Sequence, residues 1–168
     1  NGAANGGAVY FEDGLTTLTV NQNSIFTNNV ATSKGGAIYL PAALTGATIE
    51  DSSFEDNTAA SGGAIEFYST TSSSFSSNIN IKRANFTGNK ATSTNVNLGG
   101  SAIEFINVEN VDIDDCTFKS NEAGNKGTIL FNGFDGIGLT GTKFIDNSAA
   151  TSGGAICYAG STNGDSTL

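Results

Sequence analysis

Histidine and methionine are absent from this chain of 168 residues, which also contains one proline and two cysteines. Without histidine, the chain lacks the side chain that most often serves as a general base or a metal ligand near neutral pH. Serine and threonine are plentiful, but no base is available to activate one of them, so a hydrolase triad is excluded. Two cysteines cannot form a disulfide framework, and they say little about the compartment.

Positive charge and long apolar runs are also scarce. The chain has seven Lys and Arg residues against 16 Asp and Glu residues. Binding of nucleic acid needs clustered cations that displace phosphate counterions, so this balance argues against a nucleic-acid partner. No run of about 18 apolar residues occurs, so the sequence predicts no membrane span. A surface rich in Thr, Ser and Asn, as this composition implies, is typical of an exported protein.

Two short motifs recur along the whole chain. The motif Phe-x-x-Asn begins at Phe26, Phe54, Phe86, Phe118 and Phe144. The motif Gly-Gly-Ala-Ile, or its valine form, begins at Gly6, Gly35, Gly62 and Gly153, with degenerate copies at Gly100 and Lys126. Successive phenylalanines of the first motif lie 28, 32, 32 and 26 positions apart. Self-similarity at such a period indicates a repeat architecture.

Each repeat contains three short strand signals and no room for a helix of ordinary length. The first strand follows the glycines, as in Ile65-Glu66-Phe67, the second is a segment such as Thr48-Ile49-Glu50, and the third contains the Phe motif. Period-two alternation puts the first and third residues of the glycine-led strand on one face and the middle residue on the other. The middle residues, among them Glu66 and Cys157, are therefore predicted to point outward.

One such unit cannot bury its apolar face alone, but stacked units can, about 4.8 Å apart. We therefore predict an all-β fold, a parallel β-helix (solenoid) of about five to six three-stranded coils. Residues 1–168 form a single segment of it. Because the chain begins and ends in mid-repeat, we expect it to be part of a longer solenoid. Its regular end repeats would meet further coils of the same chain or neighbouring copies stacked end to end.

Equivalent residues of the stacked coils should form ladders. The five phenylalanines of the first motif would stack inside the solenoid, and the five asparagines would form an amide ladder at a corner, since an amide both donates and accepts. Glycine before Ala-Ile permits a corner with positive φ. Charges support the same register, because Lys82-Arg83 falls between Glu50-Asp51 and Asp114-Asp115. Val20 lies six residues before Phe26 rather than five, which predicts a bulge or offset.

The two motifs together resemble the repeats of the chlamydial polymorphic outer-membrane protein family, the passenger regions of large autotransporter adhesins. The resemblance extends over essentially the whole chain, and both motifs recur in order. It implies a right-handed β-helix that is exposed outside the cell and serves in adhesion or surface display. No β-barrel translocator segment is present, which fits a fragment of such a protein.

Acidic residues are the main candidates for chemistry. Enzymes built on parallel β-helices need clustered carboxylates on an outer face. The one consecutive acidic pair in an outward column is Glu66 and Glu104, which could raise one pKa or hold Ca²⁺. The simpler interpretation, which we prefer, is two solvated glutamates. The group Asp112, Asp114 and Asp115 is likewise interpreted as solvated charge beside Lys82 and Arg83.

The remaining candidates have simpler interpretations. Cys116 is predicted to be a buried free thiol, and Cys157 an outward one that does not pair with it. Asn85 begins the sequence Asn85-Phe86-Thr87, an N-glycosylation sequon on an outward position. Thr16 to Thr19 suggest an ice-binding array only superficially, because the threonine is not repeated in one column.

The sequence therefore favours a non-enzymatic extracellular or cell-surface solenoid that acts as a stalk, filament subunit or adhesin. It predicts no catalytic, cofactor-binding or metal-binding residues and no cofactor. The expected partners are further coils or copies, with a host-surface or matrix ligand as a further possibility. The alternative is a carbohydrate-binding or polysaccharide-degrading β-helix. A run of exposed aromatic residues would favour it, but only Tyr10 and Tyr39 occupy equivalent positions in neighbouring repeats.

Overall fold

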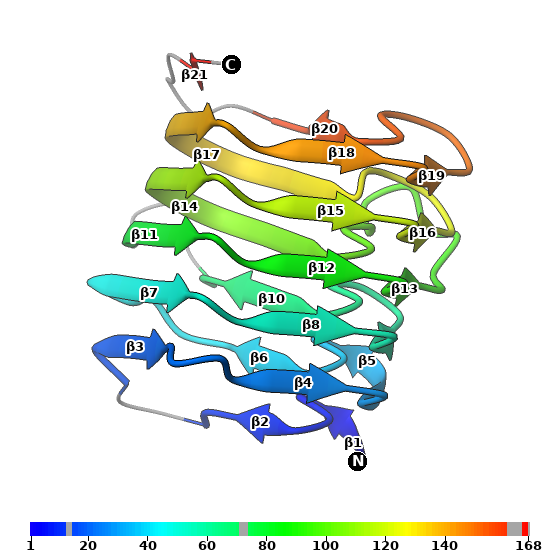
Figure 1. The fold of residues 1–168 in the computed structure, drawn as a ribbon, viewed down its shortest axis with the longest axis horizontal. Coiled ribbons are helices and arrows are strands. Elements are labelled where there is room, and N and C mark those ends of the chain that lie inside the picture. The colour runs from blue at the N-terminus through cyan, green and yellow to red at the C-terminus, as the bar shows by residue number, and fades with distance from the viewer. Residues whose placement is uncertain (13–14, 71–73, 161–165, 168) are drawn as a thin grey trace.

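The chain folds into a right-handed parallel β-helix of about five coils. The computed structural model describes residues 1–12, 15–70, 74–160 and 166–167, and these ranges contain strands and turns but no helix. The strands that carry the Phe motif cross the front of Figure 1 from left to right. The glycine-led strands return behind them as the chain rises from its N-terminus, which makes the winding right-handed. The described part of the chain contains no helix that could span a membrane.

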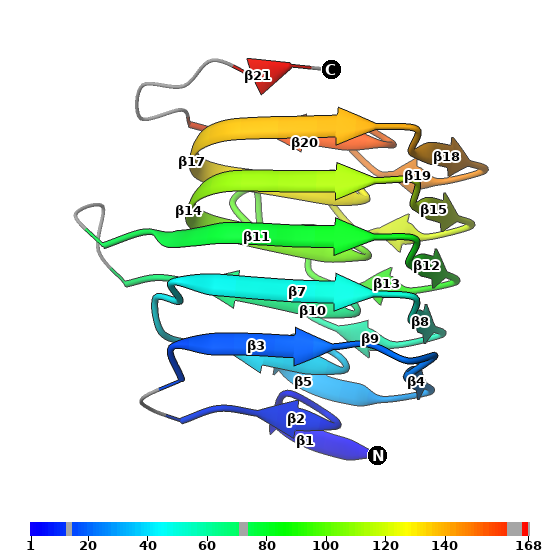
Figure 2. The ribbon, with the colours of Figure 1, turned by 60° about the vertical axis from the view of Figure 1, so that its left-hand side comes forward.

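The strands form three parallel sheets (Figures 1 and 2), of which sheets A and C receive about one strand from each coil. Sheet A contains six short strands: β1 (Gly2–Asn5), β5 (Val30–Lys34), β9 (Thr58–Ala59), β13 (Lys90–Ala91), β16 (Glu122–Ala123) and β19 (Ser148–Ala149). Sheet C contains the Phe motif: β4 (Ile25–Thr27), β8 (Ser53–Glu55), β12 (Asn85–Thr87), β15 (Thr117–Lys119) and β18 (Lys143–Ile145).

Sheet B joins the first and second predicted strands of each coil. Its glycine-led strands are β2 (Val9–Tyr10), β6 (Ile38–Leu40), β10 (Ile65–Tyr68) and β20 (Ile156–Tyr158). Its second strands are β3 (Thr17–Val20), β7 (Gly46–Glu50), β11 (Ser76–Lys82) and β21 (Ser166–Thr167). In two coils both parts merge into one long strand, β14 (Ile103–Asp114) and β17 (Ile129–Thr140). The long loop expected at 69–77 includes residues 71–73, which lie outside the described residues.

The predicted phenylalanine ladder fills the core. Phe54, Phe86 and Phe118 are fully buried, and each ring stacks on the next at 4.8–4.9 Å between centroids. Phe26 and Phe144 extend the ladder at either end. Sheet B adds a second aromatic ladder that the sequence analysis did not name, made of Phe67, Phe105, Phe131 and Tyr158. Stacked aromatic pairs add roughly 0.5–1.5 kcal/mol each beyond the area that they bury.

The predicted asparagine ladder is also confirmed, and its hydrogen bonds are complete. The backbone N–H and the side-chain Nδ2 of Asn57 both donate to Oδ1 of Asn89, at 3.0 and 2.9 Å. Nδ2 of Asn57 also donates to the carbonyl oxygen of Phe26 in the preceding coil. The same pattern continues along the stack through Asn29, Asn89, Asn121 and Asn147. A buried amide that uses both donors and its acceptor has no desolvation cost left uncompensated.

Residues with positive φ, in the left-handed backbone conformation, form the corners of the coils. Gly62 has a φ of +55°, and a Cβ atom there would lie 2.6 Å from the carbonyl oxygen of Ile65, so glycine is required as predicted. Non-glycine residues occupy the corner that precedes β8, β12 and β15, among them Arg83 at φ +49°, whereas Gly141 occupies it before β18. In the first coil this corner contains one extra residue, and Gln22 and Asn23 both have positive φ. The predicted offset is therefore an enlarged corner rather than a bulge within β3.

Candidate functional site

The middle residues of the glycine-led strands form one column across the coils: Tyr10, Tyr39, Glu66, Glu104, Leu130 and Cys157. We predicted that this column points into solvent. That prediction is wrong for the inner coils, because Glu66, Glu104 and Leu130 have no exposed surface and Tyr39 is 6% exposed. The glutamate pair is therefore buried rather than solvated.

The covering layer is the segment that leads from sheet A back to the glycines. Ser61 lies in this segment and donates a hydrogen bond from Oγ to Oε2 of Glu66 at 2.6 Å. A Cβ atom on Gly62 would lie 2.8 Å from Cβ of Glu66, and one on Gly99 would lie 3.2 Å from the side chain of Leu130. Sheet A, which the sequence analysis did not include, thus brings the chain back over this column and excludes water from it.

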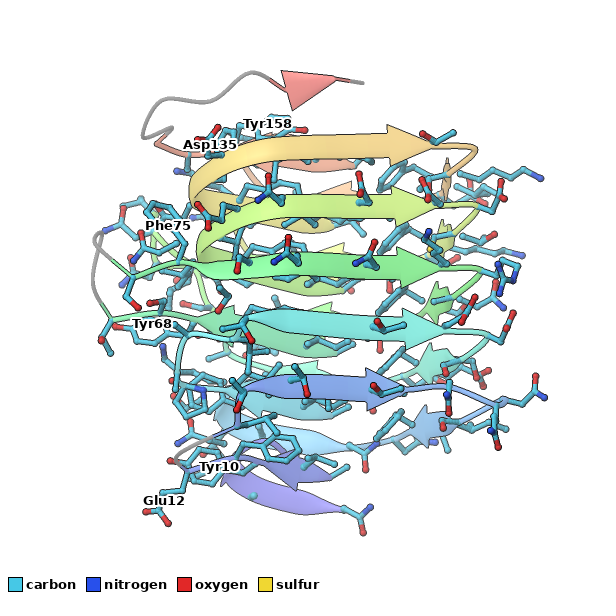
Figure 3. All side chains as sticks on the ribbon, turned by 90° about the vertical axis from the view of Figure 1, so that its left-hand side faces the viewer. Tyr10, Glu12, Tyr68, Phe75, Asp135 and Tyr158 are labelled. Carbon is cyan, nitrogen blue, oxygen red and sulfur yellow. The ribbon has the colours of Figure 1, made fainter. Side chains whose placement is uncertain are left out.

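Lys34 completes the site from the end of β5. Its Nζ lies 2.9 Å from Oε1 of Glu66, and its side chain is 27% exposed. The same Nζ lies 3.9 Å from the ring centroid of Tyr68 and 5.4 Å from that of Tyr39. An ammonium group over aromatic rings gains electrostatic energy from their faces. Tyr68 lies on the same side of the solenoid as Tyr10 (Figure 3), and Tyr39 contacts both rings.

The two buried glutamates differ in their partners. Burial raises the pKa of Glu66, while Lys34 and the hydroxyl of Ser61 act against this rise. Burial, followed by the neighbouring charge of Glu66, raises the pKa of Glu104 to about 8. Neither carboxyl oxygen of Glu104 has a hydrogen-bond partner of ordinary geometry. Glu104 is therefore protonated at neutral pH, next to a Glu66 that is ion-paired with Lys34.

The arrangement does not favour the Ca²⁺ site that the sequence left open. The ammonium group of Lys34 already supplies the positive charge next to Glu66. Burial lowers the pKa of Lys34, but Glu66 and the two tyrosines outweigh it, so the net shift is upward and the ammonium is retained. Within the described ranges, no three metal-ligating side chains are grouped closely enough to hold a metal ion.

The charge ladder predicted from the second strands is present on the outer surface. Arg83 donates from Nε to Oδ1 of Asp51 at 2.7 Å and also contacts Glu50. Lys82 lies 3.6 Å from a carboxylate oxygen of Asp114. Asp112 and Asp115 are exposed, in agreement with their interpretation as solvated charge. Exposed pairs of this kind contribute little to stability, because water screens their charges.

The cysteines are both free, as predicted. Cys116 is 1% exposed, and burial raises the pKa of its thiol to about 11, so the reactive thiolate is suppressed. Cys157 is half-buried in the column that contains Glu66.

The other sequence candidates lie apart from the buried site. Asn85 is exposed on β12, as its sequon requires. Thr17 and Thr19 are exposed on β3, but Gly46 is paired with Thr17 on the neighbouring strand, so no regular threonine array forms. Because Tyr39 is buried, Tyr10 and Tyr39 do not form an exposed aromatic run.

A second surface feature lies on the outer side of sheet C. Residues there line a groove of about 340 Å³: Asn23, Ile25, Asp51, Ser52, Ser53, Glu55, Arg83 and Asn85. Asp51 and Glu50 hold the guanidinium of Arg83 in place. The groove combines amide, carboxylate, hydroxyl and guanidinium groups with one exposed apolar side chain, Ile25.

Comparison with family models shows what the repeat is similar to. The Chlamydia polymorphic membrane protein repeat matches residues 23–41, 51–67 and 141–159. These three segments are therefore similar to the polymorphic membrane protein repeat, in agreement with the resemblance of the sequence motifs. No curated protein and no solved structure matches the chain significantly.

The three matches cover the same part of a coil in three of the coils. The match at 23–41 spans β4, β5 and β6, the match at 51–67 spans β8, β9 and most of β10, and the match at 141–159 spans β18, β19 and β20. Each match thus contains the Phe strand, the asparagine corner, a sheet A strand and the glycine corner. Lys34, Ser61 and Glu66 lie within matched segments, whereas Glu104 lies in a coil without a match.

Proposed function

We propose that this chain is a non-enzymatic solenoid of the cell surface or extracellular space that acts as a stalk, filament subunit or adhesin. The observation that carries the proposal is the polymorphic membrane protein repeat, which indicates a surface-associated protein. The fold supports it, since the internal ladders hold every coil in register and leave the outward positions free to vary. A rigid rod with variable outer side chains suits display and adhesion.

Burial of the acidic pair supports the absence of turnover. Glu66 and Glu104 have no exposed surface, so neither can touch a polysaccharide chain from solution. The chain has no histidine to act as a base in their place. We expect no product from acidic or neutral glycans, esters or peptides. Product formation that is lost in Glu66→Gln or Glu104→Gln would contradict this proposal.

The proposed partners are further coils of the same chain or neighbouring copies stacked end to end. Parallel coils offer unpaired backbone groups at each end of a stack, and such edges pair with further strands unless they are covered. Sedimentation over a range of concentrations, with amide exchange at β2 and β20, tests this. A monomer at high concentration with slow exchange in both strands would contradict it.

A second candidate function is carbohydrate binding, and the groove beside Arg83 favours it. Hydrogen-bonding groups around an apolar side chain can bind the hydroxyls and the C–H face of a sugar.

Labelling of intact cells with antibodies to this chain tests surface exposure. Binding of the purified chain to glycan and matrix-protein arrays tests adhesion, with Arg83→Ala as the groove variant and Lys119→Ala, exposed on the same sheet, as control. Cells labelled only after permeabilisation would contradict the surface role.

A further inference from the structure

The ion pair between Lys34 and Glu66 differs from the other ion pairs of the described residues. Glu66 is fully buried, whereas both partners of the pair between Lys90 and Glu122 are about half exposed or more. Both pairs join adjacent coils across 32 residues, and their N–O distances are similar, at 2.9 and 3.1 Å. The two sites therefore differ in environment rather than in spacing.

The environment of Lys34 and Glu66 contains the groups that an amide condensation requires. The lysine nitrogen lies beside the glutamate carboxyl, and the hydroxyl of Ser61 donates to its other oxygen, Oε2. Glu104, on the adjacent strand of sheet B, offers a buried carboxyl group without a hydrogen-bond partner of ordinary geometry. The rings of Tyr39 and Tyr68 lie against the lysine and limit its access to water.

We propose that Lys34 and Glu66 condense to form an intramolecular isopeptide bond between Nζ and Cδ, with Glu104 transferring the proton. The bond would be a covalent link between two adjacent coils. It is independent of the surface function proposed above, because neither residue needs an external ligand.

The reaction balances without any other reactant. The ammonium of Lys34 first gives one proton to Oε1 of Glu66 across their hydrogen bond, which produces a neutral amine and a neutral carboxyl group. The amine then attacks Cδ, and Ser61 donates to Oε2 as negative charge develops there. Glu104 gives its proton to the departing Oε1, which leaves as water, and recovers a proton from Nζ. One C–O bond is broken, one C–N bond is formed, and one water molecule is released.

Two physical effects drive this condensation in the folded chain. Burial disfavours separated charges, so it lowers the cost of the neutral amine and carboxyl form relative to water. Fixed proximity replaces a bimolecular encounter, and effective molarities in well-oriented pairs reach about 10⁵–10⁸ M. At the exposed pair of Lys90 and Glu122, the first effect is missing, so that pair should remain ionic.

The intact mass of the purified 168-residue chain tests the proposal directly. We expect a mass lower than that of the sequence by one water molecule, about 18 Da. Proteolysis should then release a branched peptide that joins Lys34 to Glu66. A chain with the full sequence mass, or a branch at any other pair, would overturn the proposal.

Three variants assign the roles. Lys34→Arg keeps the positive charge but removes the amine, so its mass should equal its own sequence mass. Lys90→Arg is the matched control and should keep the deficit of one water. Glu104→Gln keeps the size of the side chain but removes the acid, so most of that sample should lack the bond while its far-ultraviolet circular dichroism still shows β-structure.

A complete bond in Glu104→Gln would overturn the role of Glu104, and one in Lys34→Arg would overturn the assignment of the amine. If Glu104→Gln does not fold, the wild-type mass and the Lys34→Arg variant still decide the proposal.

Discussion

Replacement of Asn89 by alanine perturbs the asparagine ladder at its centre, where the side chain has no exposed surface. Nδ2 of Asn89 donates to the carbonyl oxygen of Phe54 and to Oδ1 of Asn121. Oδ1 accepts from the backbone N–H and from Nδ2 of Asn57. The alanine variant therefore leaves two donor hydrogens of Asn57 buried without an acceptor.

The expected loss of stability follows from these stranded groups. Each buried donor left without a partner costs about 1–3 kcal/mol, so two of them cost roughly 4 kcal/mol together. That is a large part of the free energy of unfolding of a typical domain, which is roughly 5–15 kcal/mol. The cost should be local as well, because each coil contacts only its neighbours. Amide exchange should therefore accelerate most at the backbone N–H of Asn57.

Urea unfolding followed by far-ultraviolet circular dichroism measures this loss, and amide exchange locates it. Asn85→Ala is the matched control, because Asn85 lies four residues earlier on the exposed side of β12. We expect that control to stay within roughly 0.5 kcal/mol of the parent. If Asn89→Ala and Asn85→Ala unfold at urea concentrations that differ by no more than the error, the ladder does not stabilise the fold as we argue.

Three further outcomes are expected. Phe86→Ala should lower the unfolding free energy by roughly 3–5 kcal/mol, because it leaves a cavity between two stacked rings, and a neutral result would contradict the aromatic ladder. Gly63→Ala should destabilise or block folding, since its Cβ would lie 2.0 Å from the carbonyl oxygen of Ser101, whereas Gly154→Ala, with 3.5 Å of clearance, should be tolerated. Glu104 has a folded-state pKa of about 8 and an ordinary value of 4.5, so folding retains a proton that the unfolded chain releases. The stability from this group is thus complete below pH 4.5 and declines as the pH rises to about 8; Glu104→Gln should flatten this decline, and an unchanged pH profile would refute the assignment.

The sequence by itself determined the coil and its register. The spacing of Phe26, Phe54 and their successors defined the period, and the alternation within each strand defined which residues stack inside. The amide ladder and the glycine corners followed, because stacked identical residues repeat the same local geometry. The order of Lys82 and Arg83 between acidic pairs gave the same register independently. All of these features depend on neighbours within one repeat or at the equivalent position of the next.

Tertiary structure alone decided the environment of the middle column. A sheet A strand such as β9 contains two residues, which is too short to produce a pattern in the sequence. Alternation shows only that Glu66 points away from the main core, and it does not show what lies on that side. The apolar residue Leu130 in the same column is the signal in the sequence that this face is covered.

The contact between Lys34 and Glu66 could not be predicted for a related reason. These residues lie in different strands of different sheets, and they meet only because the chain folds back over its own outer face after the asparagine corner. The same fold removes water from Glu104 and so keeps its carboxyl group protonated near neutral pH. In the sequence, Lys34, Glu66 and Glu104 are ordinary charged residues. Their ion pairing and protonation depend on burial, which only the stacked coils create.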